Sequence, residues 1–134
     1  MKRFSIKAAV LTVSAVIVLI SSCGHSYAVS CEDDLADFLE SKGITVTGDC
    51  AEKTVTIPDE FGEVYERYNE LQKEGGFDLT PYRSREAVVY TYSVAAVNGQ
   101  PSDFTEVHIM VCDGIIIGGD LASTALDGKM SALP

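Results

Sequence analysis

The amino-acid sequence predicts an α+β domain in which two helices pack on one face of an antiparallel sheet. Two observations support this class. Apolar residues recur at helical spacing over residues 31–42 and 58–74, and each of these segments runs into glycine. Further along, apolar and polar residues alternate over 88–94 and 104–112, as in strands with one solvated face. The order helix, β-hairpin, helix, three-stranded meander is typical of an α+β fold.

The first predicted helix covers residues 31–42. Its apolar residues lie at positions i, i+3 and i+4, namely Leu35, Phe38 and Leu39. Residues 44–47 and 54–57 then alternate between apolar and polar side chains around a turn at Gly48-Asp49-Cys50. This pattern predicts a β-hairpin.

The second predicted helix opens at Pro58-Asp59-Glu60, because proline is tolerated in a first turn and acids complement the helix dipole there. It ends at Gly75-Gly76. Its apolar stripe consists of Phe61, Val64, Tyr65, Tyr68 and Leu71. Three strands are predicted after it, at residues 88–94, 104–112 and 115–117. The Asp113-Gly114 pair joins the last two, because a type I′ turn needs positive φ at both central residues.

The chain is acidic. Its 134 residues include 20 Asp+Glu and 10 Lys+Arg, for a net charge of −10. Three of the ten cations lie in the first seven residues, so the remainder of the chain carries a net charge of −13. Such a surface repels phosphate backbones, and no basic stripe offsets it. We therefore expect no nucleic-acid partner.

The N-terminus has the pattern of a secretory leader. Three cations precede an apolar run at residues 8–20, which is shorter than the roughly 20 residues of a spanning helix. The run ends in Ile20-Ser21-Ser22-Cys23, which resembles a bacterial lipobox, the motif whose cysteine is acylated and becomes the new N-terminus. We expect a lipoprotein signal peptide at 1–22, lipidation with palmitate at Cys23, and a tether at 23–30.

The expected location is the outer face of the bacterial cytoplasmic membrane, which the protein contacts through its lipid anchor. Acyl chains contribute about 0.8 kcal/mol per buried CH₂. Two other interpretations remain open. Cleavage after Ala28 would release a secreted protein, and an uncleaved leader would itself be the anchor. All three place a single domain, residues 31–134, outside the cytoplasm.

An oxidising exterior permits a disulfide between Cys31 and Cys50. A helix from Cys31 rises about 17 Å, and the extended segment that follows returns about 23 Å, so the two thiols can meet. Closing this loop would stabilise the fold by about 3 kcal/mol. The alternative is that both thiols stay unpaired. Cys112 lies between apolar neighbours and is expected to be a small core residue.

The sequence contains none of the motifs G-x-S-x-G, G-x-x-x-x-G-K-[ST], H-E-x-x-H or G-x-G-x-x-G. Its cysteines lack the C-x₂₋₄-C spacing of zinc sites. His108 and Cys112 share a strand face but are about 13 Å apart, which excludes a thiolate–imidazole pair. We expect His108 to be structural and expect no cofactor.

Candidate binding residues fall on the second helix, the loop after it, the tyrosine-rich strand and the C-terminal segment. They are Tyr65, Tyr68, Asn69, Gln72, Asp78, Tyr90, Tyr92, Asp120, Ser123 and Asp127. The simplest interpretation is structural, with core tyrosines whose hydroxyls reach the rim and carboxylates that bond nearby amides. Alternatively, Asp120, Ser123 and Asp127 supply oxygens to a divalent cation, although the EF-hand spacing is absent. With Asp78, the two aspartates also offer an acid pair for a hydrolase.

Two segments carry a family resemblance, IPDEFGEVYERYNELQKEGGFDLTPY and IIIGGDLASTALDGKMSAL. They resemble an uncharacterised domain of clostridial and related bacterial proteins, the domain of unknown function 4830. The matching positions are Ile57, Pro58, Phe61, Val64, Tyr65, Tyr68, Asn69, Gln72, Gly76, Phe77, Asp78, Leu79, Tyr82, Gly118, Gly119, Asp120, Ser123, Asp127, Gly128, Met130 and Leu133. The resemblance implies family membership and a bacterial surface location, but the family has no known activity.

We therefore expect a non-catalytic binding module for an envelope protein or another envelope ligand. A partly solvated sheet face around Tyr90 and Tyr92 is the expected contact surface, because tyrosine offers a large contact area at low entropic cost. The alternatives are a carboxylate-dependent envelope hydrolase that uses Asp120 and Asp127, and a divalent-cation-binding domain. A concave pocket around both carboxylates would favour the hydrolase.

Overall fold

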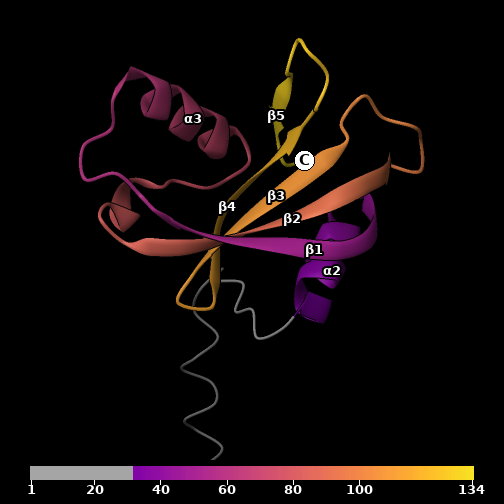
Figure 1. Cartoon of the computed structure of the whole chain (residues 1–134), viewed down its shortest axis with the longest axis horizontal. Helices are drawn as coiled ribbons and strands as arrows, with labels where there is room; N and C mark the ends of the chain where they lie inside the picture. The colour runs from indigo at the N-terminus through magenta and orange to yellow at the C-terminus, as the bar shows by residue number, and fades with distance from the viewer. Residues whose placement is uncertain (1–31) are drawn as a thin grey trace, which may run out of the picture.

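The computed structural model describes residues 32–134, which form one curved sheet and two α-helices (Figure 1). In chain order the elements are α2 (Glu32–Ser41), β1 (Ile44–Thr56), α3 (Glu63–Glu74), the 3₁₀ turn η2 (Thr80–Tyr82), β2 (Glu86–Val97), β3 (Glu106–Cys112), β4 (Ile115–Ala122) and β5 (Met130–Ala132). The α+β class is therefore confirmed. The predicted signal peptide, lipidation site and tether lie outside the described residues.

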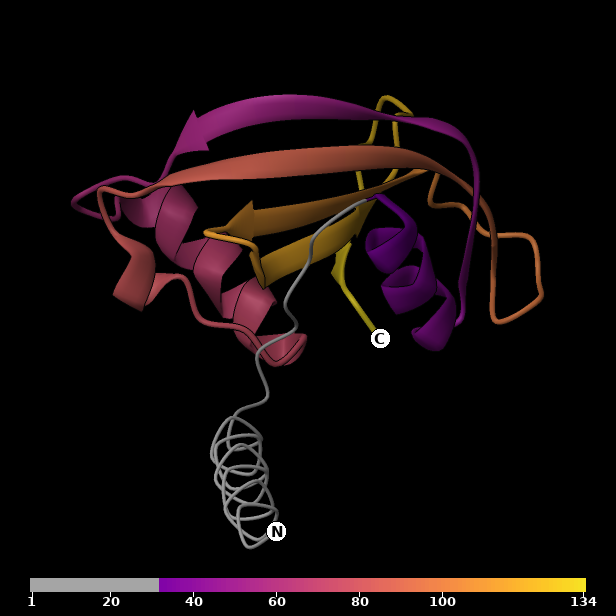
Figure 2. The ribbon, with the colours of Figure 1, turned by 90° about the horizontal axis from the view of Figure 1, so that it is seen from below.

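The strand order in the sheet follows the chain, β1-β2-β3-β4-β5, and every neighbouring pair is antiparallel. Figure 2 shows β1 along one margin of the sheet with β2 beside it. The turn between β3 and β4 has φ values of 50° at Asp113 and 74° at Gly114, as the predicted type I′ turn requires. Strand β5 forms the other edge and is an element that the sequence pattern did not predict.

The hairpin predicted within residues 44–57 is wrong, because this segment is one long strand. β1 pairs with β2 along its whole length, from Ile44 opposite Val97 to Thr56 opposite Glu86. The expected turn is a register shift between Thr47 and Ala51. Glycine at position 48 has a φ of 74°, which lets the strand bulge without reversing its direction.

The two helices pack on opposite faces of the sheet, so the prediction that both cover one face is wrong. Successive side chains of β3 point to opposite faces. Val107 and Ile109 belong to the same apolar cluster as Leu39 of α2, whereas Met110 and Cys112 belong to the cluster beside α3. Figure 1 shows α2 and α3 on opposite sides of the strands. Each face is therefore covered over only part of its area.

Two apolar cores result from this arrangement. The core under α2 contains Leu35, Phe38, Leu39, Ile44, Tyr92, Val107, Ile109, Val111, Ile116, Leu121 and Leu133. The core on the side of α3 contains Ile57, Leu79, Ala87, Met110, Cys112 and Ile117, with Phe61, Tyr65, Tyr68 and Tyr82 packed against it. Cys112 is thus the buried core residue that the sequence predicted.

Helix α3 is tied to the sheet in an unusual way. Its fully buried residues are the polar Asn69 and Gln72, whereas Val64 of the predicted apolar stripe is 81% exposed. The helix also begins later than expected, at Glu63 rather than at Pro58. Hydrogen bonds therefore contribute much of the attachment of α3 to the sheet, which in an ordinary surface helix comes from an apolar stripe.

Candidate functional site

A polar cluster lies where α3 meets the sheet. The carboxylate of Asp120 on β4 is 2% exposed, and both of its oxygens are engaged. Its Oδ1 lies 2.8 Å from Nδ1 of His108 on β3, and its Oδ2 accepts a hydrogen bond of 2.9 Å from the hydroxyl of Tyr68 on α3. On the other side of the ring, Nε2 of His108 lies 3.5 Å from Glu106 Oε2. We call these four residues the α3 clasp.

Strand register brings the members of the α3 clasp together. His108 and Asp120 are direct partners in the β3–β4 ladder, so their side chains share one face of the sheet. Glu106 precedes His108 by two residues and therefore points to the same face. Helix α3 crosses this face and supplies Tyr68. The sequence singled out Tyr68 and Asp120 but not their contact, and it did not assign His108 to any cluster.

Hydrogen bonding and burial set the protonation of the clasp. The hydrogen bond to Asp120 raises the pKa of His108 above its ordinary value, and this effect outweighs the desolvation that lowers it. Burial is the main reason that the pKa of Tyr68 is raised, and the negative charge of Asp120 raises it further. The clasp therefore favours an imidazolium at His108 between two carboxylates and a neutral phenol at Tyr68.

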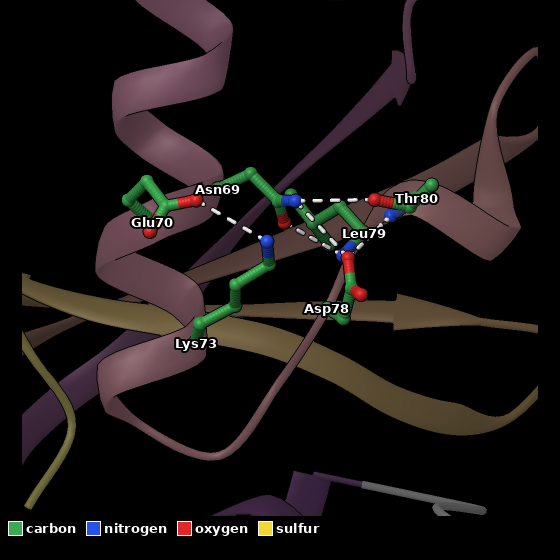
Figure 3. Close-up of polar contacts among 6 residues, drawn as sticks. All are labelled: Asn69, Glu70, Lys73, Asp78, Leu79 and Thr80. Atoms are coloured by element: carbon green, nitrogen blue, oxygen red, sulfur yellow. Dashed lines mark hydrogen bonds and ion pairs between the residues drawn. The ribbon is translucent and has the colours of Figure 1, made fainter.

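A second polar group joins α3 to the loop that follows it (Figure 3). The buried side chain of Asn69 accepts the N–H of Leu79 at 2.8 Å and donates to Asp78 at 3.0 Å and to Thr80 at 3.3 Å. The Asp78 carboxylate also accepts the N–H of Thr80 at 2.9 Å. Hydrogen bonds from the Thr80 side chain and from Asn69 hold the pKa of Asp78 at about 2. These contacts make α3 and η2 one structural unit.

Gln72 joins α3 directly to the backbone of β4. Its Oε1 accepts the N–H of Gly119 at 2.8 Å. A Cβ at Gly118 would lie 2.8 Å from Gln72 Oε1, so the glycine at this position lets α3 approach the sheet closely. A Cβ at Gly119 would instead lie 2.8 Å from the carbonyl oxygen of His108 and 2.6 Å from Leu133 Cδ1, away from α3. Within residues 32–134, Gln72 Nε2 has no hydrogen-bond partner.

A comparison with protein-family models matches residues 38–121 to the domain of unknown function DUF4830. The chain belongs to the DUF4830 family. The match confirms the resemblance found in the sequence, and it includes the whole α3 clasp. It ends at Leu121, before the β4–β5 loop.

A search of the curated proteins finds no match to the chain. A search of the solved structures finds no match either.

The remaining candidate residues of this DUF4830 domain lie elsewhere. Ser123 and Asp127 line a shallow hollow of about 260 Å³, together with Asp103, Ala125 and Lys129. Asp120 does not line this hollow. This hollow therefore does not bring Asp120 and Asp127 together in the way that the hydrolase interpretation requires. Among the described residues, no group of three or more His, Cys, Asp or Glu side chains is arranged to hold a metal ion.

The tyrosines of the DUF4830 domain are mostly packing residues. Tyr92 is 5% exposed and lies in the core under α2, and Tyr90 is half-buried against the same core. The partly solvated contact surface expected around them is therefore limited to the exposed part of Tyr90, because Tyr92 is buried in this core. Tyr65 is half-buried, and its ring centroid lies 4.7 Å from that of Phe61 and 5.7 Å from that of Tyr68.

Cys23 and Cys31 lie outside the described residues. The expected lipidation of Cys23 and the expected disulfide between Cys31 and Cys50 therefore stay predictions. Cys50 itself is half-buried and packs against the core under α2. Across residues 32–134, none of the helices is long and apolar enough to cross a membrane.

Proposed function

We propose that this DUF4830 protein is a lipid-anchored, extracytoplasmic binding module without catalytic activity. The extracytoplasmic location and the lipid anchor are supported by the cationic leader, the apolar run and the Ile20-Ser21-Ser22-Cys23 motif. The acidic charge of the remaining chain disfavours phosphate-rich partners. The outer face of the cytoplasmic membrane is the proposed location, and release as a secreted protein is the alternative.

One observation supports binding rather than catalysis. A general acid or base needs a proton-transferring atom directed at the substrate. In the α3 clasp, both nitrogens of His108 lie next to carboxylates, and both oxygens of Asp120 are engaged by His108 and Tyr68. The polar atoms of the clasp are bonded to one another, so we interpret the clasp as a structural contact between α3 and the sheet.

The proposed contact surface is the end of the sheet at the β4–β5 loop. Leu126 is fully exposed there and Met130 is 49% exposed. The hollow beside them carries the carboxylates of Asp103 and Asp127 and one ammonium group, that of Lys129. Exposed apolar groups within an acidic surround are complementary to a polypeptide segment that carries both apolar and basic side chains. We propose such a segment of an envelope protein as the partner.

The test is chemical cross-linking of the full chain in native envelopes. The double variant Leu126→Ser/Met130→Ser is expected to lose the cross-linked partner, because both apolar anchors are removed. Val64→Ser is the matched control, since Val64 is an exposed apolar residue at 81% but lies on α3. The control is expected to retain the partner, and high salt is expected to weaken the wild-type complex. Equal cross-linking by all three proteins would exclude this surface.

We further propose that Cys31 and Cys50 form a disulfide once the chain is exported. The geometry of a helix followed by a returning strand supports it, and β1 does follow α2 directly. Alkylation of the denatured, unreduced protein is expected to label Cys112 alone among the three cysteines of the domain. Labelling of Cys31 and Cys50 as well would mean that the pair is reduced.

A further inference from the structure

The joint between α3 and the sheet is built around a buried carboxylate. The buried Asp120 carboxylate accepts from Tyr68, and the charge that compensates it is on His108. The fully buried residues of α3 are the amides Asn69 and Gln72. Its apolar contribution to the core is limited to the partly buried rings of Tyr65 and Tyr68, so polar contacts carry an unusually large share of its docking.

We propose that the protonation of His108 controls the docking of α3, so that loss of the proton releases α3 together with η2 and uncovers the apolar core beneath them. The device goes beyond the proposed binding function and does not depend on the lipid anchor. It is built from the α3 clasp, the Gln72–Gly119 contact and the Asn69 hydrogen bonds.

The electrostatic argument considers every element around His108. On its own strand, Glu106 lies beside Nε2, and on β4 Asp120 lies beside Nδ1. Opposite His108 on β2 is Thr91, which does not titrate. Helix α3 contributes two phenols, Tyr68 on Asp120 and Tyr65 next to Tyr68. Among residues 32–134, the ionisable groups facing the imidazole are therefore all acids, and none of them can replace its positive charge.

A neutral imidazole leaves Asp120 as a buried carboxylate without a compensating charge. Such a charge is strongly unfavourable unless water reaches it. The Tyr68 hydroxyl occupies Oδ2 of Asp120, so water can hydrate that oxygen only if α3 moves away. The raised pKa of His108 fixes the direction of the effect. The stabilisation is fully present below the ordinary pKa of histidine and is lost as the pH rises through the raised value.

The moving unit is larger than the helix. Asn69 bonds Leu79, Asp78 and Thr80, and Gln72 O accepts the N–H of Phe77 at 2.9 Å. We therefore expect residues 63–82 to separate as one piece. Its departure uncovers an apolar surface formed by Ile57, Ala87, Met110, Cys112 and Ile117. A proton would thus switch this face of the sheet between a covered and an open state.

Hydrogen–deuterium exchange of the full chain in detergent at pH 6 and pH 9 tests this proposal. After correction for intrinsic exchange rates, we expect a several-fold loss of protection in residues 63–82 at pH 9, with residues 106–121 unchanged. His108→Gln, which cannot carry the proton, is expected to show low protection of residues 63–82 at both pH values. Asp120→Asn removes the charge that must be hydrated, so its α3 is expected to stay docked at both.

Three results would overturn the proposal. The first is equal protection of residues 63–82 at both pH values in the wild-type protein. The second is a parallel loss of protection in 63–82 and 106–121, because it would indicate global unfolding. The third is a pH step in His108→Gln as large as that of the wild type. The wild-type measurement alone decides the matter if Asp120→Asn does not fold.

Discussion

Asp120→Ala is expected to lower the free energy of unfolding by about 3 kcal/mol, because it breaks a buried ion pair and leaves two polar partners unsatisfied. The Asp120 carboxylate is 2% exposed and bonds His108 at 2.8 Å and Tyr68 at 2.9 Å. Without it, the Tyr68 hydroxyl and the imidazolium of His108 lose their shared acceptor. Urea denaturation followed by circular dichroism measures the change.

Asp127→Ala is the matched control for Asp120→Ala, since it removes the same group from an exposed position on the β4–β5 loop. Surface substitutions of this kind change stability by no more than about 0.5 kcal/mol. A loss below about 1 kcal/mol in Asp120→Ala, similar to that of the control, would show that the α3 clasp does not stabilise the fold.

Gly119→Ala is expected to destabilise the domain by about 2 to 3 kcal/mol, because the added methyl group has no room. Its Cβ would lie 2.6 Å from Leu133 Cδ1 and 2.8 Å from the backbone carbonyl oxygen of His108. The leucine can rotate, but the backbone of β3 cannot move without disturbing the strand ladder. Thermal unfolding is expected to show a drop of roughly 10 °C or more.

Gly75→Ala is the comparison for the second substitution. Gly75 has a φ of −85°, and a Cβ there would meet its neighbours at 3.4 to 3.5 Å, which is ordinary van der Waals contact. This variant is expected to be at least as stable as the wild type, because alanine reduces the entropy of the unfolded chain. If both variants unfold at the wild-type temperature, the close approach at Gly119 has no energetic importance.

Local patterns predicted the α+β class, the Asp113-Gly114 turn and the approximate positions of most elements. They failed where the outcome depends on a partner distant in the sequence. Gly48-Asp49-Cys50 has the composition of a turn, but β2 pairs with the residues on both sides of it, and the continuous ladder makes it a bulge. No local signal distinguishes the two outcomes.

The sequence did not predict the α3 clasp, because the clasp depends on a one-residue register shift between β3 and β4. Cys112 pairs with Ile115 across the tight turn, and continuing that register would place His108 opposite Gly119. A register shift between Met110 and Val111 instead places it opposite Asp120. Because side chains alternate between faces, a shift of one residue decides whether Asp120 and His108 meet. Such a bulge is not readable from this sequence.

The placement of the helices did leave a signal in the sequence. Residues 109–112 form a continuous apolar run, and the same is true of residues 115–117. A strand that is apolar on both sides is typical of a sheet that is covered on both faces. These apolar runs indicate a helix on each face of the sheet, in contrast to the alternation in residues 88–94, which is typical of one solvated face.

The most direct test of the proposed function is the intact mass of the protein extracted from bacterial membranes. We expect a polypeptide that begins at Cys23 and carries the added mass of acyl chains, and we expect Cys23→Ala to abolish that species. An unmodified chain that still begins at Met1 and is recovered from the soluble cytoplasmic fraction would contradict the lipid anchor and the extracytoplasmic location.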